Sequence, residues 1–212
     1  MKNVEKMLRL YAVTDRAWTG ARTLYEQVEA AIKGGVTCVQ LREKELGYDE
    51  FLAEAIEMKK LCAQYGVPLI INDHVEIALR CGADGVHVGQ EDMKAREVRA
   101  MAGDRLIIGV TAKTVEAARE AQAAGADYLG SGAVFGSTTK QTRAITCEEL
   151  RAICDAVAIP VVAIGGINSG NLARLAGTGI AGAAIVSGIF AAEDIEAECR
   201  ELRQMAEKVA GK

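Results

Sequence analysis

Acidic and amide side chains stand at the ends of short apolar runs in this chain of 212 residues. The run LIIND ends on Asn72 and Asp73, and Asp92 follows the run that begins at residue 85. Carboxylate oxygens are the ligands that Mg²⁺ prefers, and this ion typically takes one or two of them together with phosphate oxygens. The pattern therefore predicts a magnesium ion held by Asp73 and Asp92.

Cationic side chains follow other apolar runs. Arg42 and Lys44 close the run at 38–44, and Lys140 lies in the polar segment after the run at 128–134. Arg and Lys bind phosphate oxygens, and beside a magnesium ion they indicate a bound diphosphate. We expect these three cations to act in catalysis, because positive charge stabilises a departing diphosphate.

The elements that must position these side chains are eight apolar runs separated by helical patterns. Apolar residues recur at three- and four-residue spacing between the runs, most of these stretches end in Gly, and a last helix is predicted over 193–209. Apolar strands alternating with amphipathic helices predict a parallel sheet covered by helices. The runs lie at 10–15, 38–44, 68–73, 85–90, 106–111, 128–134, 160–166 and 183–190.

Eight units of about 26 residues predict a small (β/α)8 TIM barrel that forms a single domain over residues 1–212. A doubly wound sheet is the alternative fold. The even number of units argues against it, as does the absence of G-x-G-x-x-G after the first run.

In a TIM barrel the active site is built from the carboxyl ends of the strands, so the polar residues that close the runs are expected to meet at one rim. Gln40 and Thr111 belong to this set. Gly166 and Ser187 follow the seventh and eighth runs, where such barrels usually bind phosphate and where bare N–H groups can approach an anion. The sequence thus indicates two anionic groups, a diphosphate with its metal and a separate monophosphate.

Each feature also has a structural explanation when taken alone. Asp73 is a common type of helix cap, Asp92 suits a surface cap, and core packing is the favoured interpretation of His87. Asp84 and Asp127 each end a Gly-Ala-Asp triplet just before a run, and we interpret both as structural. The interpretation as a binding site for anions and a metal depends on the combination of these polar residues at one rim.

Composition excludes several classes of function. The net charge is −4 without a basic stripe, so neither nucleic acid nor a membrane surface is an expected partner. Six Cys without a C-x-x-C pair indicate packing in a reducing compartment. Two long uncharged stretches, 156–173 and 175–192, are interrupted by Gly, and we interpret each as a buried strand with a loop. The N-terminus lacks the apolar segment of a signal peptide, so a cytoplasmic location is expected.

The motifs resemble those of the thiamine-phosphate synthase (thiamine-phosphate pyrophosphorylase) family over about residues 9–190. The matching pieces are YAVTD, VQLREK, LIINDHVEIAL, GADGVHVGQEDM, IIGVT, GADYLGSGAVF, PVVAIGGI and IVSGIF. The resemblance implies a transferase of thiamine biosynthesis. It would join 4-amino-2-methyl-5-pyrimidinylmethyl diphosphate to 4-methyl-5-(2-phosphoethyl)thiazole, or to the carboxylated form, and release pyrophosphate through Mg²⁺-assisted loss of the diphosphate.

The resemblance also implies a role for each matching residue. The pyrimidine diphosphate would be bound by Gln40, Leu41, Arg42, Glu43, Lys44, Asn72, Thr111 and Lys140, with Asn72 at the ring and Mg²⁺ on Asp73 and Asp92. Ser137, Thr138 and Thr139 would contact the thiazole. Its phosphate would be bound by Gly166, Val186 and Ser187. Two departures are present: Gly136-Ser137 stands where the family often has Pro-Thr, and Thr111 stands where Ser is usual.

Rival functions remain at this point. A related thiazole tautomerase would act on a thiazole phosphate without joining it to a pyrimidine, and a non-catalytic relative would only bind phosphate. A sugar-phosphate barrel such as an epimerase would account for the phosphate end alone. The retained Asp pair and the three cations favour the synthase, and whether the chain forms a homo-oligomer is left open.

Overall fold

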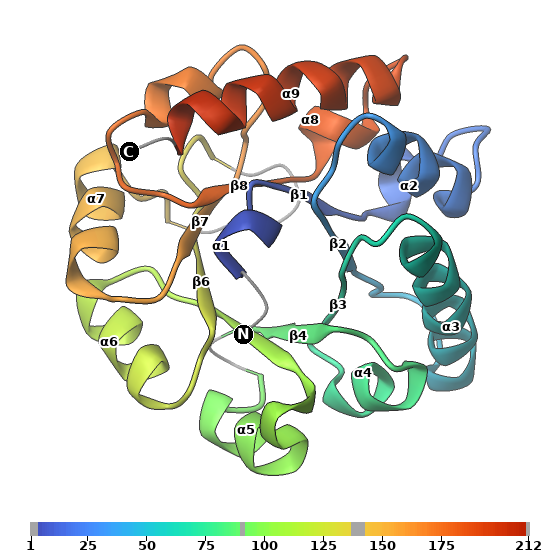
Figure 1. Ribbon diagram of the computed structural model, residues 1–212, viewed down its shortest axis with the longest axis horizontal. Coiled ribbons are helices and arrows are strands. Elements are labelled where there is room, and N and C mark those ends of the chain that lie inside the picture. Colours follow the sequence, from blue (N-terminus) through green and yellow to red (C-terminus); the bar gives the residue numbers. More distant parts are fainter. Residues whose placement is uncertain (1–3, 90–91, 137–142, 211–212) are drawn as a thin grey trace.

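Eight parallel strands close into a barrel in the computed structural model, with helices around it (Figure 1). The structure describes residues 4–89, 92–136 and 143–210. Each strand pairs with the next along the chain, and β8 returns to pair with β1. The strands are β1 Leu10–Val13, β2 Cys38–Leu41, β3 Leu69–Asn72, β4 Gly85–Val88, β5 Ile107–Thr111, β6 Tyr128–Gly132, β7 Val161–Ile164 and β8 Gly182–Ile185. The predicted TIM barrel is confirmed.

The outer layer consists of helices that follow the strands in chain order. They are α2 Leu24–Lys33, α3 Tyr48–Gln64, α4 Val75–Cys81, α5 Ala95–Ala102, α6 Val115–Ala123, α7 Cys147–Ala156, α8 Ser187–Phe190 and α9 Ile195–Val209, with 3₁₀ turns η1 Arg16–Trp18, η2 Gly103–Arg105 and η3 Leu172–Leu175. A short first helix, α1 Val4–Met7, lies across the centre of the ring (Figure 1). None of the helices in the described part of the chain is both long and apolar enough to span a membrane.

Local signals explain where a typical outer helix begins and which face it buries. Thr23 caps α2 and forms a capping box with Glu26, which satisfies N–H groups that the first turn leaves unpaired. The apolar residues Leu24, Val28 and Ala31 then recur on one face and are buried against the strands.

Alternation along the strands divides the side chains into two sets. In β1, Tyr11 and Val13 belong to a cluster inside the barrel, whereas Leu10 and Ala12 belong to the larger core between strands and helices. The interior cluster also receives Met7 from α1, which closes the amino end of the barrel. Polar side chains inside the barrel are therefore concentrated toward the opposite, carboxyl end.

The structure differs from the sequence prediction at two elements near the C-terminus. The apolar run at 183–190 divides into β8 and the short helix α8, and the segment after β7 forms the 3₁₀ turn η3 instead of an α-helix. The last helix was predicted over 193–209, and α9 spans Ile195–Val209.

Asp84 and Asp127 are structural, as predicted. Asp84 accepts from the backbone N–H of Leu69 and pairs with Lys59, and Asp127 accepts from the N–H of Ile108 at 2.7 Å. Each carboxylate thus joins the start of one strand to its neighbour. All six Cys are free thiols, three of them buried, in agreement with the packing role expected for them.

Candidate active site

A cavity of about 850 Å³ opens at the carboxyl ends of the strands. Its walls come from all eight strands or the loops that follow them. This volume suits a small organic ligand, and its position is the usual place for an active site in this fold.

Ten of the residues predicted to form the site line this one cavity. They are Gln40, Arg42, Lys44, Asn72, Asp73, Asp92, Thr111, Gly166, Val186 and Ser187. Ser137, Thr138, Thr139 and Lys140 lie outside the described residues, so their predicted roles stay predictions. The rim therefore gathers both Asp, two of the three predicted cations and the residues expected at the phosphate.

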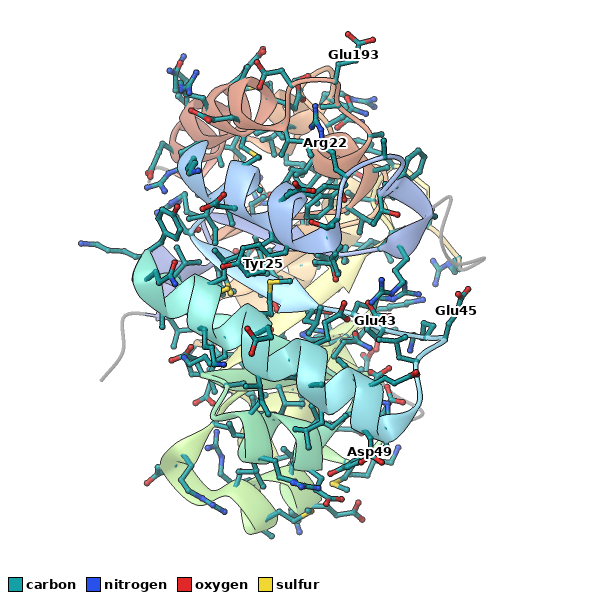
Figure 2. The ribbon with its side chains drawn as sticks, turned by 90° about the vertical axis from the view of Figure 1, so that its right-hand side faces the viewer. Arg22, Tyr25, Glu43, Glu45, Asp49 and Glu193 are labelled. Carbon is teal, nitrogen blue, oxygen red and sulfur yellow. The ribbon has the colours of Figure 1, made fainter. Side chains whose placement is uncertain are left out.

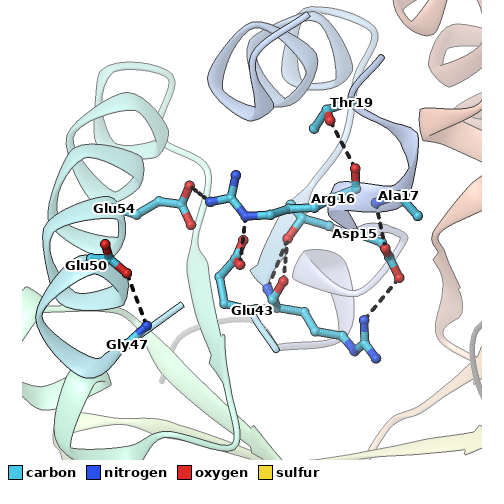
Figure 3. Close-up of polar contacts among 10 residues, drawn as sticks. Asp15, Arg16, Ala17, Thr19, Glu43, Gly47, Glu50 and Glu54 are labelled. Atoms are coloured by element: carbon cyan, nitrogen blue, oxygen red, sulfur yellow. Dashed lines mark hydrogen bonds and ion pairs between the residues drawn. The ribbon is translucent and has the colours of Figure 1, made fainter. Parts of the chain in front are cut away.

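Two other predicted residues point away from the cavity. Leu41 is fully buried in the apolar layer between strands and helices. The side chain of Glu43 is directed toward Arg16 and Glu54 (Figure 3). Side chains alternate along this segment, so Gln40, Arg42 and Lys44 face the cavity while the two residues between them face outward.

The position of Asp73 explains why a carboxylate directly follows the buried strand β3. Asp73 adopts a left-handed backbone conformation with φ of 63°, and its N–H donates to the carbonyl of His87 at 2.8 Å. The N-cap of α4 is His74, so the carboxylate of Asp73 is not engaged in capping. It accepts instead from Nζ of Lys44 at 2.7 Å, across the mouth of the cavity.

Asp92 contributes the second carboxylate of the cavity wall. Its Oδ2 accepts from the N–H of Gly89 at 2.7 Å, which fixes the turn after β4 and holds the carboxylate at the cavity. Two carboxylates beside Arg42 and Lys44 form the donor set expected for Mg²⁺ with a diphosphate, so the residues present fit this ion. Within residues 4–89, 92–136 and 143–210, no group of three or more His, Cys, Asp or Glu is placed to hold a metal.

The turn after β1 holds the backbone and side chain of Arg42. The hydroxyl of Thr14 accepts from the N–H of Arg42 at 2.9 Å, and Asp15 accepts from its guanidinium at 3.0 Å. Asp15 also caps η1 through the N–H of Ala17. A charged, hydrogen-bonded pair of this kind orients the guanidinium toward a ligand in the cavity.

Glu43 is held on the outer side of the same segment by an ion-pair cluster. Nε of Arg16 donates to Oε2 of Glu43 at 2.8 Å, and the same guanidinium pairs with Glu54 on α3. Burial, together with the nearby Glu54 carboxylate, raises the pKa of Glu43 to about 7 although Arg16 opposes the shift. Figure 2 shows Glu43 among the side chains near α2 and α3, whereas Glu45 points outward at the rim.

Sequence reasoning missed several residues of the cavity. Tyr11, Lys113 and Arg143 line it, and so does His87, for which core packing had been the favoured interpretation. His87 bonds to Tyr128 and Thr111, and burial lowers its pKa to about 4 in spite of the opposing charge of Asp92. The period of two along β4 was the signal that could have placed His87 inside the barrel.

The turn after β7 forms the opposite wall. Gly165 and Gly166 have φ of 103° and 65°, values that favour glycine, and a Cβ on Gly166 would lie 2.5 Å from the carbonyl oxygen of Phe135. Val186 and Ser187 lie beside this turn in the cavity wall, and Ser187 is the first residue of α8.

Comparison with known proteins places this site in a family. The model of a family described as thiamine monophosphate synthase matches residues 10–189. The chain belongs to the thiamine monophosphate synthase family. It is therefore an enzyme of the transferase class, and the tautomerase and non-catalytic alternatives lose their support.

Similar proteins cover nearly the whole chain. A thiamine-phosphate synthase of Clostridium acetobutylicum is 46% identical over 98% of each chain, and one of Ruminiclostridium cellulolyticum is 49% identical over 92% of this chain and 94% of its own. A thiamine phosphate pyrophosphorylase of Pyrococcus furiosus has a similar structure, with a TM-score of 0.91 at 38% identity over 99% of this chain and 100% of its own. A 3-hexulose-6-phosphate synthase, at 20% identity and a TM-score of 0.69 over 92% of this chain and 99% of its own, shares the fold.

Proposed function

We propose that the chain joins 4-amino-2-methyl-5-pyrimidinylmethyl diphosphate to 4-methyl-5-(2-phosphoethyl)thiazole, giving thiamine phosphate and pyrophosphate. The observation that carries this proposal is the composition of the cavity at the strand ends. It combines Asp73 and Asp92 with Arg42 and Lys44 on one side and the Gly165–Gly166 turn on the other. These two sides suit a metal-bound diphosphate and a separate phosphate.

The diphosphate side supplies charge where the reaction needs it. The C–O bond between the pyrimidinylmethyl carbon and the diphosphate breaks, and its electron pair leaves with pyrophosphate. We assign Arg42, whose guanidinium is oriented by Asp15, and Lys44 to neutralising that growing charge, because both line the cavity, and we expect Lys140 to join them. The lone pair of the thiazole nitrogen then forms the new C–N bond, so no nucleophilic side chain of the protein is needed.

We further propose that Asp73 and Asp92 hold a Mg²⁺ ion. When bound, the ion would neutralise the diphosphate and make it a better leaving group. Lys44 now pairs with Asp73, and a diphosphate would offer the ammonium group new anionic partners. The Lys44 side chain is half exposed, with 51% of its surface accessible, so its ammonium group can turn toward a ligand at small cost.

The rest of the cavity is assigned to orienting the two substrates. Gln40 and Asn72 lie deeper in the barrel and are assigned to the pyrimidine ring, and Thr111 to the diphosphate. Gly166, Val186 and Ser187 are assigned to the thiazole phosphate, because N–H groups at this turn can approach an anion closely. Ser137, Thr138 and Thr139 are assigned to the thiazole. Holding both reactants in one cavity removes much of the entropic part of the barrier.

The deciding experiment supplies both substrates and Mg²⁺ to the purified protein and measures thiamine phosphate as its fluorescent oxidation product. We expect product that disappears with EDTA and returns with added Mg²⁺. The plain and carboxylated thiazole phosphates are tested side by side, which shows the preferred acceptor. Folded protein that binds both substrates and forms no product would refute the proposal.

Two variants separate the metal from the rest of the mechanism. Asp73→Asn should lower kcat by at least about 10²-fold and weaken the Mg²⁺ dependence of the rate, because an amide is a poor ligand for this ion. Asp155→Asn is the matched control, since Asp155 is exposed at the end of α7 and pairs only loosely with Arg151. Equal Mg²⁺ titrations for both variants would remove Asp73 from the metal site.

A further inference from the structure

Five polar side chains form a continuous hydrogen-bonded chain across the floor of the cavity. Nε2 of Gln40 donates to the hydroxyl of Tyr11 at 2.7 Å, and that hydroxyl lies 2.9 Å from the hydroxyl of Tyr128. Tyr128 contacts Nδ1 of His87 at 3.1 Å, and Nε2 of the same ring contacts the hydroxyl of Thr111 at 3.0 Å. The chain crosses five strands and begins and ends at residues that line the cavity.

Neighbouring strands leave room for this chain. A Cβ on Gly109 would lie 2.1 Å from Cζ and 2.3 Å from the hydroxyl of Tyr128, and 2.5 Å from Nδ1 of His87. A Cβ on Gly130 would lie 3.0 Å from Cε1 of His87. Both glycines stand at positions that face the barrel interior, so β5 and β6 omit side chains where the polar chain passes.

Only two arrangements of the hydrogens satisfy every hydrogen bond of this chain of side chains. In one, each group donates toward Thr111, and in the other each group donates toward Gln40. Each tyrosine has one hydroxyl hydrogen, and the neutral imidazole has one N–H and one acceptor nitrogen. Burial raises the pKa of both tyrosines well above its usual value, so they keep these hydrogens. A reversal in the middle of the chain would leave two hydrogens or two lone pairs face to face, which costs about as much as a lost buried hydrogen bond.

The two directions present different groups to a ligand. In the direction that the structure shows at Gln40, the amide N–H donates into the chain, His87 donates to Thr111, and the Thr111 hydroxyl is left to donate into the cavity. The carbonyl oxygen of Gln40 is then left as an acceptor. In the opposite direction the carbonyl oxygen of Gln40 accepts from Tyr11. Thr111 then donates to His87, and its hydroxyl offers only lone pairs to a ligand in the cavity.

We propose that this chain couples recognition of an anion at Thr111 to recognition of a hydrogen-bond donor at Gln40. A diphosphate oxygen accepts from Thr111 and so selects the first direction, in which the Gln40 oxygen accepts from the exocyclic amino group of the pyrimidine. Tyr11, Tyr128 and His87 act as positioning residues, because they transmit the direction between the two ends. The inference rests on the proposed function, and it adds a reason for the enzyme to bind the amino group and the diphosphate as one unit.

The test measures the coupling between the two halves of the substrate. Binding of 4-amino-5-hydroxymethyl-2-methylpyrimidine is followed by calorimetry at fixed Mg²⁺, with and without saturating inorganic pyrophosphate. We expect pyrophosphate to tighten the pyrimidine by about five- to tenfold in the wild-type protein, the effect of one hydrogen bond. Tyr128→Phe, which removes only a hydroxyl, should reduce the effect to less than about twofold.

Further variants keep the test decisive. Thr111→Val breaks the far end of the chain at a partly exposed position and should lose the same coupling, so the result stands even where Tyr128→Phe folds poorly. Ile107→Val changes packing in the same interior cluster but removes no polar atom, so it should keep the coupling. Coupling that is absent in the wild-type protein, or unchanged in both Tyr128→Phe and Thr111→Val, overturns the inference. Wild-type protein that binds neither probe and forms no product refutes the proposed function itself.

Discussion

Replacement of Glu43 by Gln tests the electrostatics of the segment that carries Arg42 and Lys44. The Glu43 side chain is only 2% exposed, and among the described residues its Oε1 atom has no hydrogen-bond partner. Burial and Glu54 raise its pKa from 4.5 to about 7. Gln keeps an oxygen that can accept from Arg16, and it removes the charge that burial disfavours.

The sign of the effect follows from proton binding. Between pH 4.5 and about 7 the folded protein holds a proton on Glu43 that the unfolded chain has lost, so stability falls as the pH rises through this window. At about 1.4 kcal/mol per pH unit the full window corresponds to on the order of 3 kcal/mol. Because the Glu54 carboxylate and the Arg16 guanidinium act on Glu43 in opposite directions, we expect about 2 kcal/mol in practice.

The assay is urea unfolding at pH 5 and pH 8. The wild-type protein should lose about 2 kcal/mol of unfolding free energy relative to Glu43→Gln over this interval. Glu45→Gln is the control, since Glu45 is exposed two residues farther along the chain, and it should follow the wild-type curve (Figure 2). Parallel curves for the wild-type protein and Glu43→Gln would show that Glu43 is ionised in the folded protein at pH 5, and the reasoning would be refuted.

Three further predictions follow from other contacts. Gly109→Ala should destabilise the protein by about 1–3 kcal/mol in urea, because the new Cβ overlaps the Tyr128 hydroxyl; unchanged stability would contradict the close approach. Asp127→Ala should lower the free energy of unfolding by about 1–3 kcal/mol, because it removes the acceptor of the Ile108 N–H. Because Asp127 lies away from the cavity, kcat should stay the same. A loss of kcat without a loss of stability would argue against a structural role. Lys113→Ala should lower kcat/KM for the pyrimidine diphosphate about tenfold, because Lys113 lines the cavity and its charge favours the anionic substrate. Steady-state kinetics measure this change, with Lys208→Ala as the control. Equal kcat/KM values for the two variants would show that Lys113 is not involved.

Part of the site followed from the sequence because it depends on local order. Apolar runs and their polar ends placed Asn72, Asp73 and Thr111 at strand ends, and the barrel rule then brought them to one rim. The period of two along β2 also contained the information that Gln40 faces the cavity and that Leu41 does not. That signal was present in the sequence, and the expectation for Leu41 was drawn from the family motif instead.

Other features depended on which strands become neighbours when the barrel closes. His87 bonds to Tyr128, forty-one residues away, and Tyr11 meets the same hydroxyl across 117 residues. Arg16 meets Glu43 and Glu54 because the turn after β1 packs beside α3. Their partners are set by strand register, by the glycines that admit large side chains, and by the packing of helices on strands.

The sequence by itself determined the alternation of strands and helices, the closed barrel and the chemical character of its rim, because hydrophobic periodicity and turn residues act over short stretches of chain. Only the tertiary structure decided the raised pKa of Glu43, the turning of His87 into the cavity and the hydrogen-bonded chain between Gln40 and Thr111. The physical reason is that burial, pKa and hydrogen-bond direction are properties of the groups that surround a side chain, and in a barrel these groups come from the whole length of the chain.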